Sequence, residues 1–173
     1  MDFELFNTYS NKTELFIPLD DNDIRIYACG PTVYDYIHVG NARPLIIFDV
    51  LVRFLKLIYP KVTYVRNITD VDDKIIVQAN QNKESINNLT ERTIKAFSDD
   101  ADALFVKKPD FEPRATEHIQ EMLKMIKVLL ESGNAYLSDG HVLFSVSSMP
   151  NYGKLSGMNL SEMIDGARVE VSD

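Results

Sequence analysis

Two short apolar segments flank a helix-like stretch near the start of the chain. Residues 24–29 alternate loosely and become fully apolar before a Gly-Pro step, which predicts a buried strand. Residues 62–68 follow a proline break and are rich in β-branched and aromatic side chains, which predicts a second strand ending at Thr69-Asp70. A strand, a helix and a strand in this order form a right-handed parallel unit, so both strand ends are expected at one edge of the sheet.

The stretch between these strands is predicted to be helical from about Asn41, with Pro44 in the first turn. Its polar residues recur at spacings of four and three and form one stripe: Asp49, Arg53 and Lys56. The rest of the cylinder is apolar, so we expect this helix to be buried over most of its circumference.

Beyond residue 70 the pattern changes to helices with polar surfaces. Helices are predicted over residues 72–80, 86–105 and 113–132. Gly133 is a suitable stop for the last of these, in which Met122, Met125 and Leu129 are expected to be ordinary core residues. Residues 135–146 predict a β-hairpin, because their Asp-Gly pair favours the turn that matches strand twist, and a short helix is expected near residues 161–165.

Composition limits the classes of protein that remain. A hydrophobic content of 45% over 173 residues suffices for one core of ordinary size. The net charge of −8 argues against a broad basic surface for nucleic acid, so any RNA contact must be local. The longest apolar run, residues 45–58, is interrupted by charges and is shorter than the roughly 20 residues of a membrane span. We therefore expect no membrane association. Residues 1–20 contain charges throughout and show no secretory signal. A single cysteine excludes an intramolecular disulfide and fits a reducing, cytoplasmic compartment.

His38-Val-Gly-Asn41 is the candidate phosphate-binding element. A helix N-terminus offers free backbone N–H groups and the positive end of a dipole, an imidazole can donate to phosphate oxygens, and Gly40 lets a nucleotide approach the backbone. The chain contains neither G-x-G-x-x-G nor a P-loop sequence. The same residues could equally form a histidine cap in a glycine-containing loop, and both interpretations stay open.

Metal binding is only weakly supported by the residues themselves. Free cysteine usually packs in the interior, and one cysteine with three histidines gives no zinc-ligand spacing of the usual kind, so Cys29 could act only together with ligands from elsewhere. The carboxylates of Asp70, Asp72 and Asp73 cluster at a predicted strand end. However, no calcium-loop glycine follows, and acidic residues are also favoured at a helix N-terminus.

Three segments closely resemble the amino-terminal part of cysteinyl-tRNA synthetases: residues 27–35 (YACGPTVYD), 38–43 (HVGNAR) and 64–74 (YVRNITDVDDK). Shorter stretches around Glu112, Gly133, Tyr152 and Gly166 also look like that family, so the resemblance extends over nearly the whole chain. The resemblance implies an α/β fold with the Rossmann-like parallel sheet of a class I synthetase, a mainly helical insertion and a β-hairpin. Residues 1–72 would form the first half of the catalytic domain, and residues 73–173 a truncated part of the connective insertion.

The implied activity is the activation of cysteine with ATP and magnesium, followed by transfer to tRNA(Cys). By resemblance, Cys29 would be the first ligand of a zinc ion that binds the substrate thiolate, which a serine hydroxyl could not replace at neutral pH. The implied cysteine-binding residues are Cys29, Gly30 and Thr69. The implied ATP-binding residues are Pro31, His38, Gly40 and Asn41, of which His38 and Asn41 would be catalytic.

Two departures from the family pattern matter. Asn41 replaces the last histidine of the HIGH signature, which keeps a hydrogen-bond donor but loses a protonatable ring. The chain also lacks the family's other zinc ligands (a Cys, a His and a Glu) and its KMSKS loop, so we expect these 173 residues to be inactive alone.

Two other functions stay open. One is a ligase that joins cysteine to an amino sugar-inositol, which resembles these synthetases and also forms a cysteinyl adenylate. The other is a non-catalytic binding module derived from the fold. For the parent protein we favour a monomer.

Overall fold

The computed structural model describes residues 2–158. The chain forms two compact units: Pro18–Ile119, and Met1–Ile17 together with Gln120–Asp173. The candidate site residues named above all lie in the first of these, here called the central unit. The expected division at residue 72, between the first half of the catalytic domain and the connective insertion, stays a prediction.

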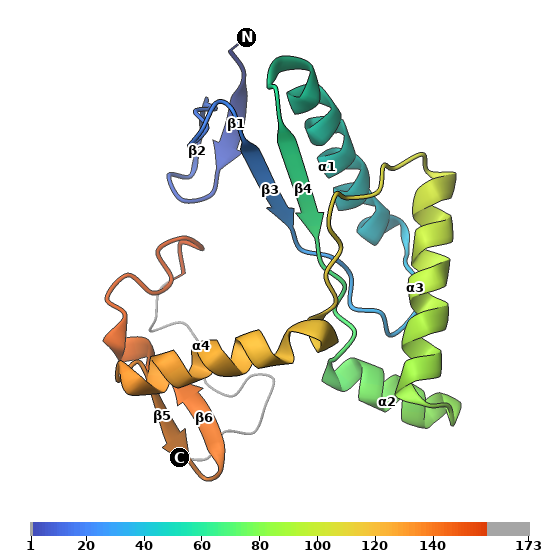
Figure 1. Cartoon of the computed structure of the whole chain (residues 1–173), viewed down its shortest axis with the longest axis vertical. Helices are drawn as coiled ribbons and strands as arrows, with labels where there is room; N and C mark the ends of the chain where they lie inside the picture. The colour runs from blue at the N-terminus through green and yellow to red at the C-terminus, as the bar shows by residue number, and fades with distance from the viewer. Residues whose placement is uncertain (1, 159–173) are drawn as a thin grey trace. The chain divides into compact units, whose positions relative to one another are not determined.

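The central unit is built on a parallel pair of strands. Strand β3 (Ile24–Ala28) pairs with β4 (Val62–Arg66) in parallel, with Ala28 opposite Arg66 (Figure 1). Helix α1 (Val39–Ile58) connects them, which confirms the predicted strand, helix and strand. The parallel pairing brings the carboxyl ends of both strands to one edge of the sheet.

A third segment extends this sheet along the other edge of β4. Phe111 forms a parallel bridge with Val65, and Arg114 forms one with Ile68. The N–H of Ile68 donates to the carbonyl of Pro113 at 2.9 Å. The helix predicted over 113–132 is therefore wrong at its start: the chain forms a 3-10 turn, η1 (Ala115–His118), and then α4 (Ile119–Glu131).

Helix α1 also begins earlier than predicted. His38 is its N-cap, because the ring Nδ1 accepts from the N–H of Gly40 and the Oδ1 of Asn41 accepts from the N–H of His38. This reciprocal capping box fixes the first helical residue at Val39. Pro44 consequently lies inside the helix rather than in its first turn.

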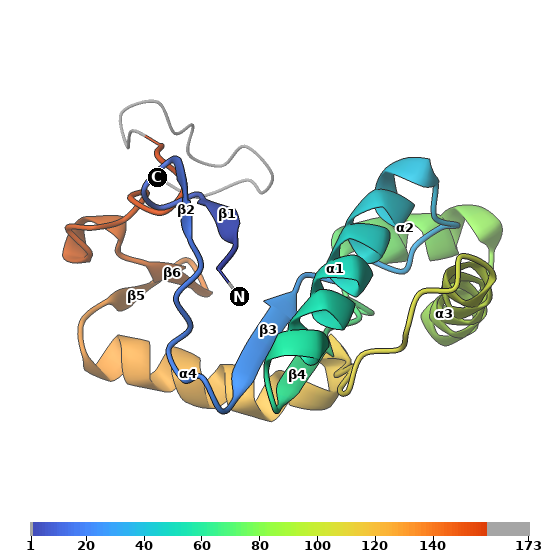
Figure 2. The same ribbon diagram turned by 90° about the horizontal axis from the view of Figure 1, so that it is seen from above.

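The expected burial of α1 over most of its circumference is wrong. Its buried residues are Leu45, Asp49, Val52 and Leu55, which recur on one face, while Ile47 and Val50 are more than half exposed. Figure 2 shows α1 lying along one side of the pair of strands β3 and β4. Asp49 was assigned to an outward polar stripe but is buried. Its carboxylate accepts from Arg53 Nε at 2.7 Å and from the N–H of Lys107 at 2.9 Å, so these bonds compensate for its burial.

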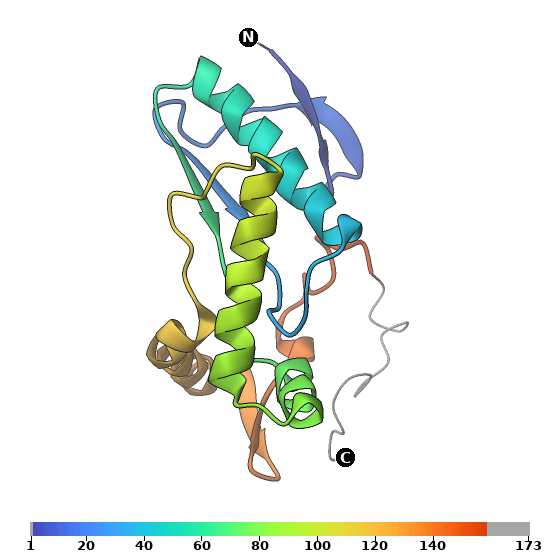
Figure 3. The same cartoon turned by 90° about the vertical axis from the view of Figure 1, so that its right-hand side faces the viewer.

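Two further helices complete the central unit. Helix α2 (Asp73–Asn82), capped by Asp72, packs against α3 (Ile86–Ala103). In Figure 3, α3 (yellow-green) crosses in front of α1 (teal) at an oblique angle. The hydroxyl of Thr93 on α3 lies 2.8 Å from the carbonyl of Val33 and so ties the loop before α1 to this helix. The core is formed by Val33, Leu45, Ile68, Ile75, Ala79, Leu89, Phe97, Ala101 and Val106.

The other unit contains two hairpins. Strands β1 (Glu4–Asn7) and β2 (Lys12–Leu15), which were not predicted, pair antiparallel. Strands β5 (Ala135–Ser138) and β6 (His141–Phe144) form the predicted hairpin and precede a short 3-10 turn, η2 (Val146–Ser148). Asp139 and Gly140 both have positive φ, as the Asp-Gly signal implied.

Helix α4 ends as expected but packs differently. The N–H of Asn134 donates to Leu129 and the N–H of Gly133 to Leu130, the bonding pattern of a Schellman stop, which confirms the role of Gly133. Met122 and Met125 are exposed, so their assignment to a core was wrong. The short helix expected near 161–165 lies outside the described residues. Among the described residues, no helix is long and apolar enough to cross a membrane.

Candidate functional site

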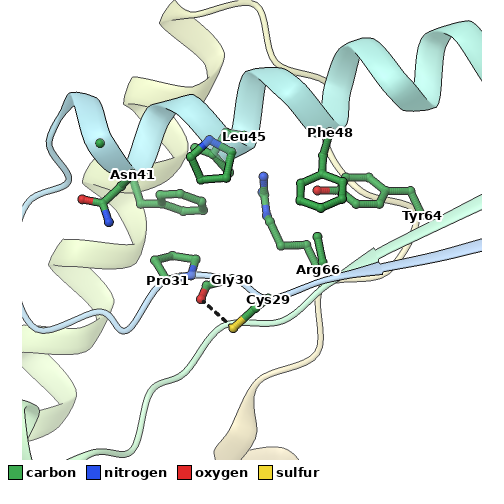
Figure 4. Close-up of a pocket in the computed structure, with 12 residues that line it drawn as sticks. Cys29, Gly30, Pro31, Asn41, Leu45, Phe48, Tyr64 and Arg66 are labelled. Carbon is green, nitrogen blue, oxygen red and sulfur yellow. Dashed lines mark hydrogen bonds between the residues drawn. The ribbon is translucent and has the colours of Figure 1, made fainter. Parts of the chain in front are cut away.

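Cys29 follows β3 directly, at the carboxyl edge of the sheet. Ala28 is buried on the side of α1, and the alternation of side chains along a strand turns Cys29 to the opposite side. Its side chain points away from α1 and is exposed, with Sγ 3.6 Å from the carbonyl oxygen of Gly30 (Figure 4). The thiol is therefore accessible from the face of the sheet that α1 leaves free.

Gly30 is required where it stands. A Cβ added to it would lie 1.5 Å from the backbone oxygen of Asn67, an overlap that no side chain can relieve. The close approach allows the N–H of Gly30 to donate to Asn67 Oδ1 at 2.9 Å. Glycine thus lets the loop after β3 lie directly against the residue that follows β4.

Thr69 is joined to the same loop directly through its backbone, and its hydroxyl group bonds Asn67. Its N–H donates to the carbonyl of Pro31 at 3.0 Å, and its carbonyl accepts from the N–H of Val33 at 3.1 Å. Its Oγ1 accepts from Asn67 Nδ2 at 3.1 Å. The three predicted cysteine-binding residues therefore lie on adjacent, hydrogen-bonded segments.

His38, Gly40 and Asn41 form the second corner of the site, at the start of α1. The bond from the N–H of Gly40 occupies His38 Nδ1 at 3.0 Å, so a neutral imidazole carries its proton on Nε2. The capping interpretation of His38 is confirmed. Capping leaves Nε2–H unused among the described residues, so it does not exclude a contact to phosphate.

A cavity of about 110 Å³ lies between the first half of α1 and the strand ends. Five predicted site residues line it: Cys29, Gly30, Pro31, Gly40 and Asn41 (Figure 4). His38 and Thr69 do not line the cavity and reach it only through the bonds described above. The structure thus brings the two corners together at one place.

Arg66 was missed by the sequence analysis, although it lies in a segment quoted for the family resemblance. Its side chain is only 5% exposed; Nη2 donates to Glu112 at 2.6 Å, and the guanidinium lies 4.9 Å from the ring centroid of Phe97. Burial raises the pKa of Tyr64, and the neighbouring Arg66 charge partly opposes this rise. Arg66 therefore links β4, α3 and the third segment of the sheet, and it also lines the cavity (Figure 4).

We expect Glu112→Gln to destabilise the chain by about 2 kcal/mol, because it leaves the buried Arg66 charge without its anionic partner. Urea-induced unfolding followed by circular dichroism measures the loss. The matched control is Asp99→Asn, which removes the exposed pair with Lys95 and should cost less than about 0.5 kcal/mol. Equal losses in the two variants would contradict the structural importance of Arg66.

Two of the three carboxylates considered as a metal site have hydrogen-bond partners of their own. Asp70 accepts from the N–H and the hydroxyl of Thr116, at 3.0 and 2.6 Å, and Asp72 caps α2. Asp73 lies in the first turn of α2. Within residues 2–158, no three His, Cys, Asp or Glu side chains are grouped as metal ligands. Cys29 could supply one sulfur ligand to a metal completed by other residues.

Comparison with known proteins gives a consistent result. The chain is 54% identical to a cysteine–tRNA ligase of Gluconobacter oxydans over 168 residues, and 55% identical to one of Azorhizobium caulinodans over 174 residues. These alignments cover 97% and 99% of the chain but only 37% and 38% of the relatives, so the chain spans less than two fifths of their length.

A solved structure and a family model agree with these relatives. The fold resembles Mycobacterium tuberculosis methionyl-tRNA synthetase in complex with methionyl-adenylate, with a TM-score of 0.60 over 71% of this chain and 29% of that one. At 18% identity this likeness concerns the fold alone, and it supports the predicted α/β, Rossmann-like class. The model of the class I (C) tRNA synthetase catalytic domain matches residues 15–173, and the chain therefore belongs to this family.

Proposed function

We propose that this chain is part of a cysteine–tRNA ligase and carries the residues that hold cysteine and the ATP phosphates while the adenylate forms. The observation that carries the proposal is the convergence of two corners on one cavity, in a chain more than half identical to such ligases. One corner contains Cys29 and Gly30, and the other contains Gly40 and Asn41. Ligands of open parallel sheets bind at this edge, beyond the carboxyl ends of the strands.

Cysteine would bind on the side of Cys29, Gly30 and Thr69. An exposed thiol beside the free face of the sheet fits one ligand of a zinc ion, with the other ligands supplied by residues beyond those described. Such an ion, when bound, would favour a thiolate over a hydroxyl and so select cysteine over serine. Gly30 holds the loop after β3 against Asn67, which fixes the backbone on this side of the site.

ATP, with its magnesium ion, would bind on the side of α1. The Nε2–H of His38 would donate to phosphate oxygens, and the helix dipole favours their charge. The N–H groups of Gly40 and Asn41 already donate to His38 within the cap. In the proposed reaction a carboxylate oxygen of cysteine attacks the α-phosphorus, and pyrophosphate leaves. A ribose hydroxyl at the 3′ end of tRNA(Cys) then displaces AMP from the adenylate. The catalytic share of His38 and Asn41 is stabilisation of the phosphate charge that grows during the first step.

Aminoacylation separates this proposal from its rivals. The full-length protein should transfer radiolabelled cysteine to tRNA(Cys). We propose that it acts as a cytoplasmic monomer with tRNA as its partner. Transfer to an amino sugar-inositol acceptor instead would support the other ligase. Failure of both transfers and of adenylate formation would favour a binding module.

We expect the 173-residue chain alone to form no adenylate. It retains the His38 corner and one wall of the cysteine pocket, but its sequence contains no KMSKS-like lysine loop. Loss of one preorganised electrostatic contact commonly lowers turnover about a hundredfold to a thousandfold, and several are missing here. Cysteine-dependent pyrophosphate exchange on the purified chain measures this, and turnover near that of the full-length protein would contradict the assignment of the site.

A further inference from the structure

The side chain of Asn67 bridges two elements of the proposed cysteine pocket. Its Oδ1 accepts from the N–H of Gly30 at 2.9 Å, and its Nδ2 donates to Thr69 Oγ1 at 3.1 Å. The orientation of the amide is fixed, because a backbone N–H can face only the oxygen of an amide and not its NH₂ group. The NH₂ group of Asn67 is therefore the hydrogen-bond donor to the hydroxyl oxygen of Thr69.

This donor determines what the Thr69 hydroxyl can offer. A hydroxyl has one proton and two lone pairs, and Asn67 occupies one lone pair of Thr69 Oγ1. Among the described residues, Thr69 Oγ1 makes no other side-chain hydrogen bond, so its proton is directed away from Asn67. Backbone hydrogen bonds to Pro31 and Val33 hold the Cα of Thr69 beside the loop after β3.

We propose that Asn67 is a positioning residue that makes Thr69 a hydrogen-bond donor to the bound substrate. This inference rests on the proposed function. The matching ligand group is an anionic acceptor of cysteine, which is either its carboxylate oxygen or its thiolate sulfur. Asn67 itself contacts Gly30 and Thr69 rather than the substrate, and it sets both the position of the loop and the direction of the hydroxyl.

The test is Asn67→Asp in the full-length protein, measured by cysteine-dependent pyrophosphate exchange. This change keeps the acceptor for the N–H of Gly30 but replaces the NH₂ group by an acceptor, so the Thr69 hydroxyl turns its proton toward residue 67. The KM for cysteine should rise about tenfold or more, while the KM for ATP changes less than about twofold. The control Asn88→Asp adds the same charge at an exposed position on α3 and should change neither constant.

A double variant separates the hydroxyl from the added charge. Thr69→Val alone should raise the KM for cysteine about tenfold, and adding Asn67→Asp to it should raise the constant less than about twofold further. If the new carboxylate acted by charge alone, its effect would be equally large without the hydroxyl. Cysteamine lacks the carboxylate, so its inhibition constant should rise in Asn67→Asp only if the thiolate is the acceptor.

Additive effects of the two changes, or a cysteine KM within about twofold of the wild type in Asn67→Asp, would overturn the inference. Equal increases in the KM values for cysteine and ATP, together with lower thermal stability, would show that Asn67 has only a structural role. If the wild-type protein exchanges no pyrophosphate with cysteine, the proposed function fails instead. In that case neutron diffraction tests the orientation of the Thr69 hydroxyl. We expect its deuterium to point away from Asn67 in the wild type and toward residue 67 in Asn67→Asp.

Discussion

Gly30→Ala is expected to abolish cysteine activation and to destabilise the chain by about 3 kcal/mol, a cost at the upper end for overpacking a closely fitted site. The added Cβ would lie 1.5 Å from the backbone oxygen of Asn67 and 3.3 Å from Cγ of Arg66. The backbone beside β4 cannot move without breaking its pairing on both edges, so the Cys29–Gly30 turn must shift instead. A displacement of about 1 Å at a reacting site can cost a hundredfold in rate.

Two measurements check this expectation: urea unfolding of the chain, and cysteine-dependent pyrophosphate exchange by the full-length protein. The control is Gly133→Ala, in which the new Cβ meets no atom within 4 Å and only the positive φ of 74° opposes the change. This variant should cost about 1 kcal/mol and leave the exchange rate unchanged. A Gly30→Ala protein with wild-type turnover would show that the loop after β3 does not form the site.

His38→Ala is expected to lower the turnover of adenylate formation about a hundredfold to a thousandfold, because it removes a donor to phosphate charge that grows in the transition state. The change also removes the cap of α1, at a cost of about 1 kcal/mol in stability. His38→Ser separates the two roles, since a serine hydroxyl can cap the helix but cannot reach as far as Nε2. We expect His38→Ser to recover most of the stability and little of the turnover.

Pyrophosphate exchange at saturating cysteine and ATP measures the turnover of the His38 variants, and urea unfolding measures their stability. Recovery of turnover in His38→Ser would mean that the imidazole serves only as a cap. Unchanged turnover with a raised requirement for cysteine would show that His38 acts on cysteine and not on the ATP phosphates.

Local signals predicted most of the central unit, and the errors have physical causes. The helix start at α1 was placed too late because its N-cap is a histidine, which is outside the usual set of capping residues. Residues near 113 were predicted to be helical, but the parallel bridges of Phe111 with Val65 and of Arg114 with Ile68 hold them extended. Such long-range pairing leaves no periodic pattern in the sequence.

Burial was harder to predict than secondary structure. The apolar pattern of α1 predicted a helix covered on nearly all sides, yet only one face packs on the strands. Asp49 looked like a surface residue because nothing local shows that Arg53 and the N–H of Lys107 complete its hydrogen bonds. Hairpin β1–β2 was missed because its residues are mainly polar and exposed.

In the candidate site too, residues with local sequence signals were predicted, and residues whose roles depend on distant contacts were not. Cys29 and His38 stood out because rare residue types mark the ends of recognisable elements. Arg66 and Asn67 did not, since their roles depend on Glu112 and Gly30, which lie 46 and 37 positions away in the sequence. A single sequence contains no sign of such contacts except the resemblance of the whole segment to a family.

The proposed function gives this chain the cysteine-activating site of a tRNA ligase. The most direct test is ATP–pyrophosphate exchange by the full-length protein, measured with each amino acid in turn and repeated with Cys29→Ser. We expect exchange with cysteine, exchange with serine lower by a factor of about a thousand or more, and loss of the cysteine reaction in Cys29→Ser. Exchange supported equally by serine, or a Cys29→Ser protein with wild-type cysteine activation, would contradict it.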